Sequence, residues 1–268
     1  MNTNENKLTD AELLRQLVDG YLYNHYQLSL NTLDDWYGFR LCNFVTTLKG
    51  VQFEFLDANT SKAVELITRE INIASEYNFE ELDFKPGDVV IDIGANVGMV
   101  SIYLAKVYPF LKIYSFEPIK LNYSNFVQNI QKNEIPDGTI IHERKAVTGD
   151  GRSVSLMFNP LNSGGSAVTD FNQKGYIMKA EDQNIESITL NEIFEKYDIK
   201  KVKLLKIDCE GAEYEILRNC STQNLKKIEH LRGEFHELSS LPTEDNCIDL
   251  IKFCKKYIKN VDVVELRG

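Results

Sequence analysis

The chain has 268 residues, of which 43% are hydrophobic and 26% charged, and its formal net charge is −10. These values are typical of a globular protein, and the acidic charge argues against a nucleic-acid partner, because phosphate backbones are bound by clusters of Lys and Arg. No apolar stretch approaches the roughly 18 residues that span a membrane. The polar start lacks a secretory signal, and the five cysteines are scattered without C-x-x-C spacing. We therefore expect a cytoplasmic protein with neither a disulfide framework nor a zinc knuckle.

The first part of the chain, residues 1–50, differs from the rest. Residues 8–18 have apolar residues at helical spacing, and an aromatic-rich stretch follows them. Aromatic residues at this density usually pack a small cap onto a neighbouring domain or subunit. We expect residues 1–50 to be a helical N-terminal extension and residues 51–268 to be the main domain. A substrate lid and a homodimer interface are both open as roles for the extension.

Strands and helices alternate from residue 88 onward, which is typical of a Rossmann-like, doubly wound, mostly parallel α/β sheet. Before them, residues 51–56 predict a strand and residues 63–77 a helix. The later strands are predicted at 88–94, 111–117, 139–145, 202–208, 228–236 and 261–266. The helices between them are predicted at 97–106, 119–133, 188–197, 211–220 and 245–257.

A long connection, residues 148–187, interrupts this alternation. It contains an alternating stretch at 153–158 and then Asn162, Ser163 and Gly164. Loops of this length inside a compact domain are more often functional than idle. We therefore expect those three residues to contact the substrate.

The most informative stretch is an apolar strand that ends at Asp92 and runs through a glycine-rich turn into a helix. At Gly94 the missing Cβ would let a ligand approach the backbone, and at Gly98 it would let the helix and strand pack closely. The free N–H groups at the helix start would point into the crevice above the sheet. This arrangement predicts a site for a nucleotide-type cofactor.

Two carboxylates indicate which cofactor binds there. The turn reads D-x-G-x-x-x-G and lacks the G-x-G-x-x-G pattern of dinucleotide sites. Asp92 would repel a diphosphate and attract a cation, and Glu117, about twenty residues after Gly94, is placed to accept hydrogen bonds from a ribose. S-adenosylmethionine carries a sulfonium and an ammonium group, so these acids favour it over NAD. Its product would be S-adenosylhomocysteine.

A second apolar strand also ends in a carboxylate, Asp208, which is expected in the same crevice as Asp92. Lys206, two residues earlier, needs a carboxylate partner or a polar crevice because it lies in an apolar strand. Glu210 and Glu213 follow at a helix start, where the helix dipole favours negative charge. For Glu213 we prefer that purely structural role.

A third strand tip carries Glu234 and His236 on one face. Histidine has a pKa near physiological pH, which suits it to accept a hydroxyl proton. We expect His236, Asp208, Glu234 and Lys206 to form the catalytic group. Asp208 and Glu234 could instead share a divalent cation, but no compact ligand spacing assigns a metal.

These motifs resemble the FkbM family of S-adenosylmethionine-dependent methyltransferases from about residue 51 to the end. The resemblance implies a class I methyltransferase fold, normally with a seventh, antiparallel strand, and O-methylation of sugar or polyketide hydroxyls. Only six sheet strands can be placed before the sequence stops, so a seventh is hard to locate. The residues expected to bind the cofactor are Asp92, Gly94, Ala95, Asn96 and Gly98 for the methionine part, Glu117 with Pro118 for the ribose, Glu143 and Ala146 around the adenine, and Asp208.

The predicted activity is methyl transfer to a hydroxyl of a sugar, either a nucleotide-activated sugar or a glycan precursor. The donor is already activated, so the protein mainly positions the reactants while His236 or Asp208 removes the proton. The rival enzyme is an NAD-dependent sugar oxidoreductase or epimerase, although Tyr197 and Lys201 form its Tyr-x-x-x-Lys spacing only at a helix end. A non-sugar natural product as acceptor and a non-catalytic binding protein are further alternatives.

Overall fold

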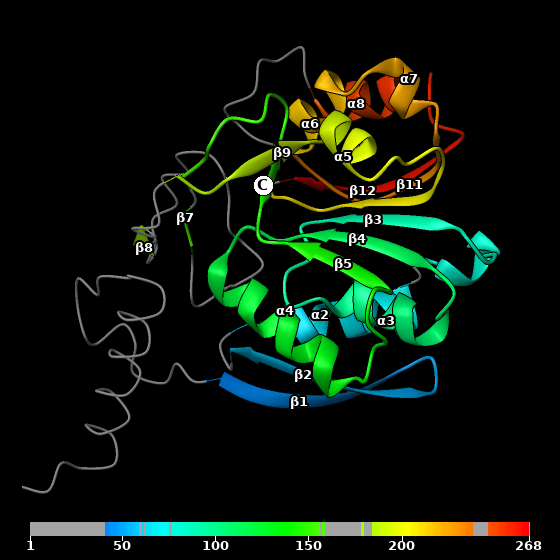
Figure 1. Cartoon of the computed structure of the whole chain (residues 1–268). Helices are drawn as coiled ribbons and strands as arrows, with labels where there is room; N and C mark the ends of the chain where they lie inside the picture. The colour runs from blue at the N-terminus through cyan, green and yellow to red at the C-terminus, as the bar shows by residue number, and fades with distance from the viewer. Residues whose placement is uncertain are drawn as a thin grey trace, which may run out of the picture.

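A six-stranded parallel sheet forms the centre of the protein (Figure 1). The structure is a computed structural model that describes residues 41–58, 61, 63–74, 77–155, 157–158, 178–179, 184–237 and 246–267. The sheet has the order β12-β11-β10-β3-β4-β5, and every neighbouring pair in it is parallel. The strands are β3 (Val89–Ile93), β4 (Lys112–Phe116), β5 (Ile140–Glu143), β10 (Val202–Ile207), β11 (Ile228–Glu237) and β12 (Asn260–Arg267). The predicted doubly wound α/β fold is confirmed.

Helices cover both faces of this sheet (Figure 1). One face packs α2 (Ala63–Arg69), α3 (Met99–Val107) and α4 (Lys120–Lys132). The other packs α5 (Leu190–Lys196), α6 (Glu213–Asn219), α7 (Thr222–Leu225) and α8 (Cys247–Cys254). Successive side chains of a strand point to opposite faces, so Val90 and Ile91 belong to different hydrophobic clusters. The buried, apolar strands that the sequence predicted are therefore sealed from both sides.

The last strand differs from the expectation that the family resemblance raised. β12 runs parallel to β11, and the described residues contain no antiparallel strand in this sheet. The physical reason is the connection, because α8 packs on the sheet between β11 and β12 and returns the chain as a βαβ crossover.

A separate hairpin lies beyond α4 and corrects part of the predicted extension (Figure 1). β1 (Leu41–Leu48) pairs antiparallel with β2 (Val51–Ala58), so residues 41–48 are a strand rather than part of a helical cap. The two-residue turn between them, Lys49 and Gly50, has positive φ at both positions, which matches the twist of paired strands. Residues 1–40, including the predicted helix at 8–18, lie outside the described residues.

Two asparagines, Asn129 in the last turn of α4 and Asn133 at its C-cap, bind the free edge of that hairpin. Asn129 accepts from the Leu56 N–H at 2.6 Å and donates to the Leu56 carbonyl at 3.2 Å. One helical turn later, Asn133 does the same for Glu54, at 3.1 and 2.7 Å. The two amides thereby satisfy backbone groups that an edge strand would leave unpaired. Asn129 also donates to the Val97 carbonyl at 2.9 Å and so connects the hairpin to the glycine-rich turn.

The long connection begins and ends in short paired strands. β6 (Ala146–Thr148) pairs with β9 (Ser187–Thr189), β7 (Met157–Phe158) pairs with β8 (Met178–Lys179), and Val154 forms a bridge with Ile185. The stretch predicted as a strand at 153–158 is thus paired at both of its ends. The predicted substrate residues Asn162, Ser163 and Gly164 lie outside the described residues.

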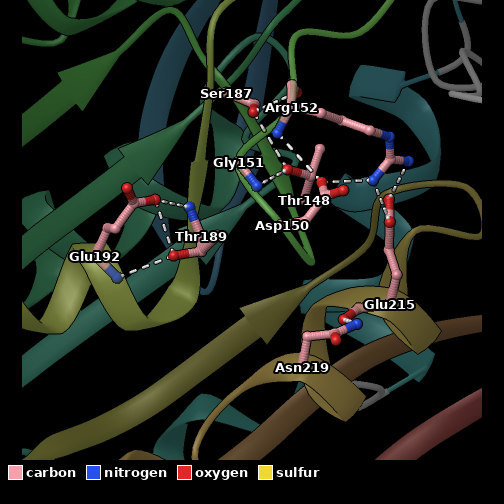
Figure 2. Close-up of polar contacts among 9 residues, drawn as sticks. All are labelled: Thr148, Asp150, Gly151, Arg152, Ser187, Thr189, Glu192, Glu215 and Asn219. Atoms are coloured by element: carbon pink, nitrogen blue, oxygen red, sulfur yellow. Dashed lines mark hydrogen bonds and ion pairs between the residues drawn. The ribbon is translucent and has the colours of Figure 1, made fainter.

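Side chains fix the base of this connection against two helices (Figure 2). Arg152 binds both carboxylate oxygens of Glu215 on α6, at 2.6 and 3.0 Å. Thr189 and Glu192 form a capping box that starts α5. Two short helical turns, Glu70–Ala74 and Phe79–Leu82, complete the described elements.

All five cysteines are free, as the sequence predicted. Among the helices of the described ranges, none is both long enough and apolar enough to cross a membrane.

Candidate functional site

A row of polar residues crosses one face of the otherwise apolar sheet. The strand register places Asp262, Arg232, Lys206, Asp92 and Ser115 side by side on neighbouring strands. Register neighbours in a parallel sheet point to the same face, so the two bases of this row, Arg232 and Lys206, lie between the acids Asp262 and Asp92. In β3, β4 and β10 the row lies just before the carboxyl end of the strand, where open α/β sheets bind their ligands.

Asp92 and Lys206 form the buried centre of the row. The Asp92 carboxylate is fully buried, accepts from the Ser101 hydroxyl at 2.6 Å and lies 3.3 Å from the Lys206 ammonium. Lys206 is 3% exposed and donates to the Gly94 carbonyl at 2.7 Å, and its ammonium is 3.9 Å from Asp208. Burial alone would lower the pKa of Lys206, but Asp92 and Asp208 raise it above its usual range, so the group stays charged. Lys206 therefore joins the turn to the ends of β3 and β10, and its predicted catalytic role stays a prediction.

The contacts of Asp92 differ from those that we expected from the sequence. We expected its carboxylate to face a cationic ligand, but its described contacts are with Ser101 and Lys206 behind the turn. Asp208, whose side chain is 23% exposed, is the acid of the pair that reaches the surface of the crevice.

The two glycines of the turn are required by the chain's own packing. A Cβ on Gly94, which has φ +76°, would lie 1.8 Å from the Asp208 carbonyl oxygen. A Cβ on Gly98 would lie 1.9 Å from the ring of Phe126 on α4. We expected Gly94 to make room for a ligand and Gly98 to let helix and strand pack. The structure shows that Gly94 lets β3 approach the end of β10, and that Gly98 lets α4 approach the turn.

The turn is joined to Glu117, the predicted ribose acceptor. Gly94 and Ala95 both donate to the Phe116 carbonyl at 3.0 Å, which keeps the ends of β3 and β4 together. Glu117 is 4% exposed, and its two oxygens accept from the Asn96 N–H at 2.9 Å and the Ile119 N–H at 2.8 Å. Burial raises the pKa of Glu117 to about 7, which exceeds the opposing effect of the two amides. Pro118 lies between Glu117 and Ile119 and is partly buried.

The two residues predicted around the adenine lie farther along the same edge. The Glu143 carbonyl accepts from the Glu117 N–H at 3.2 Å, so the end of β5 adjoins the end of β4. The Glu143 side chain binds Lys196 at 2.7 Å and the Tyr197 hydroxyl, which fixes the end of α5. Ala146 is buried in β6. Their contact with an adenine stays a prediction, as does the predicted cofactor contact of Asp208.

Asp208, Glu234 and His236, predicted from two separate strands, come together at the carboxyl edge. One ligand-type atom from each lies within 4.8 Å of the other two. His236 is oriented from behind, because its Nδ1 is 3.1 Å from an oxygen of Glu213 that also accepts from the Cys209 N–H at 2.9 Å. The opposite nitrogen, Nε2, is 3.5 Å from Glu210 and 3.7 Å from Glu234.

The protonation of this group reflects its crowding with negative charge. Burial alone would lower the pKa of His236, but the hydrogen bond to Glu213 and the charges of Glu213 and Glu210 raise it to about 9. Burial, followed by the charge of Asp208, raises the pKa of Glu234 to about 7. His236 is therefore protonated at neutral pH in this arrangement. Its role as the base stays a prediction, with Asp208 as the other candidate.

Sequence reasoning missed the part that Glu213 and Tyr77 play here. Glu213 is fully buried and orients His236, although a helix-start role had been preferred for it. Glu213 lies in the same motif as Asp208, and this closeness in the sequence could have indicated that Glu213 contacts His236. Tyr77 is also buried, and Asp208 and Glu234 are among the charges that act on its hydroxyl. No local sequence pattern indicates a role for Tyr77, which lies before β3, the first strand of the six-stranded sheet.

Comparison with known proteins identifies relatives. Residues 92–259 match the family model described as "Methyltransferase FkbM domain". "Methyltransferase 1" of Beauveria bassiana is 30% identical over 186 residues, which are 63% of this chain and 72% of that protein. The "31-O-demethyl-FK506 methyltransferase FkbM" of Streptomyces tacrolimicus is 22% identical, over 65% of this chain and 75% of its own.

A third relative is the "Hexuronic acid methyltransferase AglP" of Haloferax volcanii, which is 23% identical over 66% of this chain and 69% of its own. Among solved structures, the N-terminal domain of human METTL16 in complex with SAH aligns with 95% of this chain and 66% of that one. Its identity is 11% and its TM-score 0.31, and this likeness carries no argument about function.

Proposed function

Because the chain belongs to the FkbM family of methyltransferases, we propose that it transfers a methyl group from S-adenosylmethionine to a sugar hydroxyl. The acceptor we propose is a nucleotide-activated sugar or a glycan precursor. The observation that carries the proposal is the shared edge of the sheet, where Glu117 and the glycine-rich turn adjoin the group of Asp208, Glu234 and His236.

Glu117 fits the ribose of such a cofactor. Its buried carboxylate accepts from two backbone amides, and the Asn122 side chain also acts on it, but two carboxylate oxygens have about four acceptor sites and so can accept further bonds. A ribose diol would supply two such donors and offset the cost of burying the charge. The carboxylates of Asp208 and Glu234, which lie on the other side of β3, suit the positive charge of the methionine part. When bound, S-adenosylmethionine supplies an activated methyl group on a sulfonium.

The chain's own residues would then position the acceptor and receive its proton. Lys206 fixes the turn and the end of β10, so that the cofactor-side and acceptor-side residues keep one geometry. Since the methyl group is already activated, most of the catalysis would come from bringing the two reactants into line. The proton of the acceptor hydroxyl would pass to an Asp208 oxygen, or to His236 Nε2 in molecules in which that histidine has lost its own proton.

The sugar acceptor is supported by the name of one relative, the hexuronic acid methyltransferase of Haloferax volcanii. The name of the FK506 methyltransferase supports a non-sugar natural product as the alternative. Both acceptors present a hydroxyl, so the same residues would serve either reaction.

Calorimetric titration with S-adenosylmethionine, S-adenosylhomocysteine and NAD tests the cofactor. We expect both adenosyl ligands to bind and NAD to give no response. Glu117→Gln should weaken both by about 10- to 100-fold, because hydrogen bonds to a charged group contribute roughly 1.5–3 kcal/mol. Glu229→Gln, at the opposite edge of the sheet, is the matched control and should bind normally.

Transfer of a labelled methyl group then tests the acceptor against nucleotide sugars and polyketide alcohols. Methylation of the sugars supports the proposed acceptor, and methylation of the polyketides alone assigns the alternative. Binding of NAD without either adenosyl ligand would overturn the proposed function.

A further inference from the structure

The geometry at the carboxyl edge points to a divalent cation held by Asp208, Glu234 and His236, and we propose Mn²⁺ or Mg²⁺ as its occupant. One donor atom from each residue lies within 4.8 Å of the others. Atoms that ligate a cation at about 2.0–2.2 Å lie roughly 3–4.4 Å from each other, so only a small closure is required. Two carboxylates with one imidazole form a mixed oxygen and nitrogen set that such cations accept.

The orientation of His236 agrees with this assignment. Glu213 is fully buried and holds Nδ1 at 3.1 Å, which turns Nε2 toward the carboxylates. A carboxylate behind the far nitrogen of a histidine is the usual outer partner of a metal-binding imidazole. Glu210, 3.5 Å from Nε2, lies on the same side and could add a further oxygen ligand.

An unsatisfied group near the cluster supplies an independent observation. The Tyr77 side chain is 2% exposed, and its hydroxyl has no hydrogen-bond partner among the described residues. Burial and, after it, the charges of Asp208, Glu70 and Glu234 raise the pKa of Tyr77, so its hydroxyl remains a donor. A buried hydroxyl without a partner is costly and rare. A water or acceptor oxygen on the cation would give it one.

The charges of the described neighbours favour a cation over a closed ion-pair network. Asp208, Glu210, Glu213 and Glu234 supply four carboxylates around His236. The buried ammonium of Lys206 is closer to Asp92, at 3.3 Å, than to Asp208, at 3.9 Å. The cluster therefore has negative charge that these partners do not offset. On the proposed function, the cation would bind the acceptor hydroxyl and lower its pKa.

Mn²⁺ titration of the metal-free protein tests the site without any adenosyl ligand or acceptor. Electron paramagnetic resonance and calorimetry should show one saturable Mn²⁺ per chain. Asp208→Asn and Glu234→Gln should each weaken Mn²⁺ binding by more than about 100-fold, which exceeds the usual cost of losing an outer partner. Glu229→Gln removes a carboxylate from the other end of the same strand and should leave Mn²⁺ binding unchanged.

Glu213→Gln keeps all three ligands and tests the positioning of His236 separately. It should weaken Mn²⁺ binding by about 10-fold, the lower limit for an outer-shell change. Circular dichroism of each variant identifies any that does not fold. Absence of saturable binding in the wild type would overturn the proposal, as would unchanged affinity in folded Asp208→Asn and Glu234→Gln.

Titration with S-adenosylhomocysteine on the same samples separates this proposal from the proposed function. If the adenosyl ligand binds and Mn²⁺ does not, the metal site fails while the methyltransferase assignment stands. If Mn²⁺ binds and the adenosyl ligand does not, the metal site stands and the proposed function fails.

Discussion

Two carboxylates of the same strand, β11, lie in opposite surroundings. Glu229 is the second residue of the strand, at the amino edge of the sheet, where the parallel strands begin, and it lies beside lysines. Glu234 lies toward the carboxyl edge, where the strands end, among other carboxylates. Lys201 and Lys203 are 2.7 and 3.2 Å from Glu229, and their hydrogen bonds lower its pKa to about 2. Burial and the charge of Asp208 raise the pKa of Glu234 to about 7. The neighbours of Glu229 thus stabilise its charged form, whereas the surroundings of Glu234 disfavour its charged form.

The difference between the edges indicates where the fold holds residues for function. Like charges gathered in a partly buried place oppose folding, so a folded chain that carries them requires another reason for them. At the amino edge no such reason is needed, because Glu229 has lysine partners. At the carboxyl edge the cation and the positively charged cofactor that we propose would supply it.

The largest expected effect is on stability, and it compares one glycine at the carboxyl edge of the sheet, Gly94, with one at the amino edge, Gly138. Gly94 and Gly138 have nearly the same backbone, with φ of +76° and +77°. A Cβ on Gly94 meets the Asp208 carbonyl at 1.8 Å, whereas one on Gly138 meets nothing within 4 Å. Gly138→Ala should cost about 1–2 kcal/mol of unfolding free energy, the strain of a left-handed alanine. Gly94→Ala should cost more than about 3 kcal/mol, because backbone must move.

Urea denaturation measures both free energies, and calorimetry shows whether the adenosyl ligand still binds. Equal losses in the two variants would mean that the Asp208 contact does not make Gly94 necessary.

The second effect is on pH dependence and compares Glu117 with Glu229. The folded pKa of Glu117, about 7, is above its ordinary value of 4.5, so wild-type stability should fall as pH rises through that interval. The folded pKa of Glu229, about 2, is below 4.5, so its contribution is present above pH 4.5 and is lost as pH falls toward 2. Glu117→Gln should flatten the first slope, and Glu229→Gln the second.

Urea denaturation of the wild type and both variants across this pH range checks the two slopes. Unchanged slopes in either variant would remove the titration of that carboxylate from the account of stability.

Much of the sheet was predictable, because its strands are short apolar runs separated by turn residues. The rule that ligands bind at the carboxyl ends of parallel strands also located Asp208, Glu234 and His236 near one another. The pairing of Asp92 with Lys206 was not predictable, since both strands end in a carboxylate and the sequence does not say which the lysine prefers. Nor could the sequence reveal that Tyr77 lies within the influence of Asp208 and Glu234, which are more than 100 residues away in the chain.

The hairpin shows a different limit. Its first strand, β1, was included in an aromatic-rich extension that was expected to be helical. The run of aromatic and β-branched residues from Phe44 to Thr47 and the Lys49-Gly50 turn were local signals for a hairpin. Asn129 and Asn133 hold the hairpin by hydrogen bonds to its backbone. Because they lie more than seventy residues later in the chain, these contacts could be found only in the folded structure.

The smallest effect tests whether burial, rather than position at the carboxyl edge, makes a carboxylate important. Glu215 lies on α6, the same helix as Glu213, but it pairs with Arg152 at the surface, where the two side chains are 28% and 46% exposed. A solvated pair of this kind contributes about 0.2–1 kcal/mol. Arg152→Lys, which removes the two-pronged contact but keeps the charge, should lower stability by at most that amount and leave Mn²⁺ and adenosyl-ligand affinities unchanged. A loss of either affinity would show that the base of the long connection helps to set the position of Glu213 and His236, so that the exposed pair belongs to the site after all.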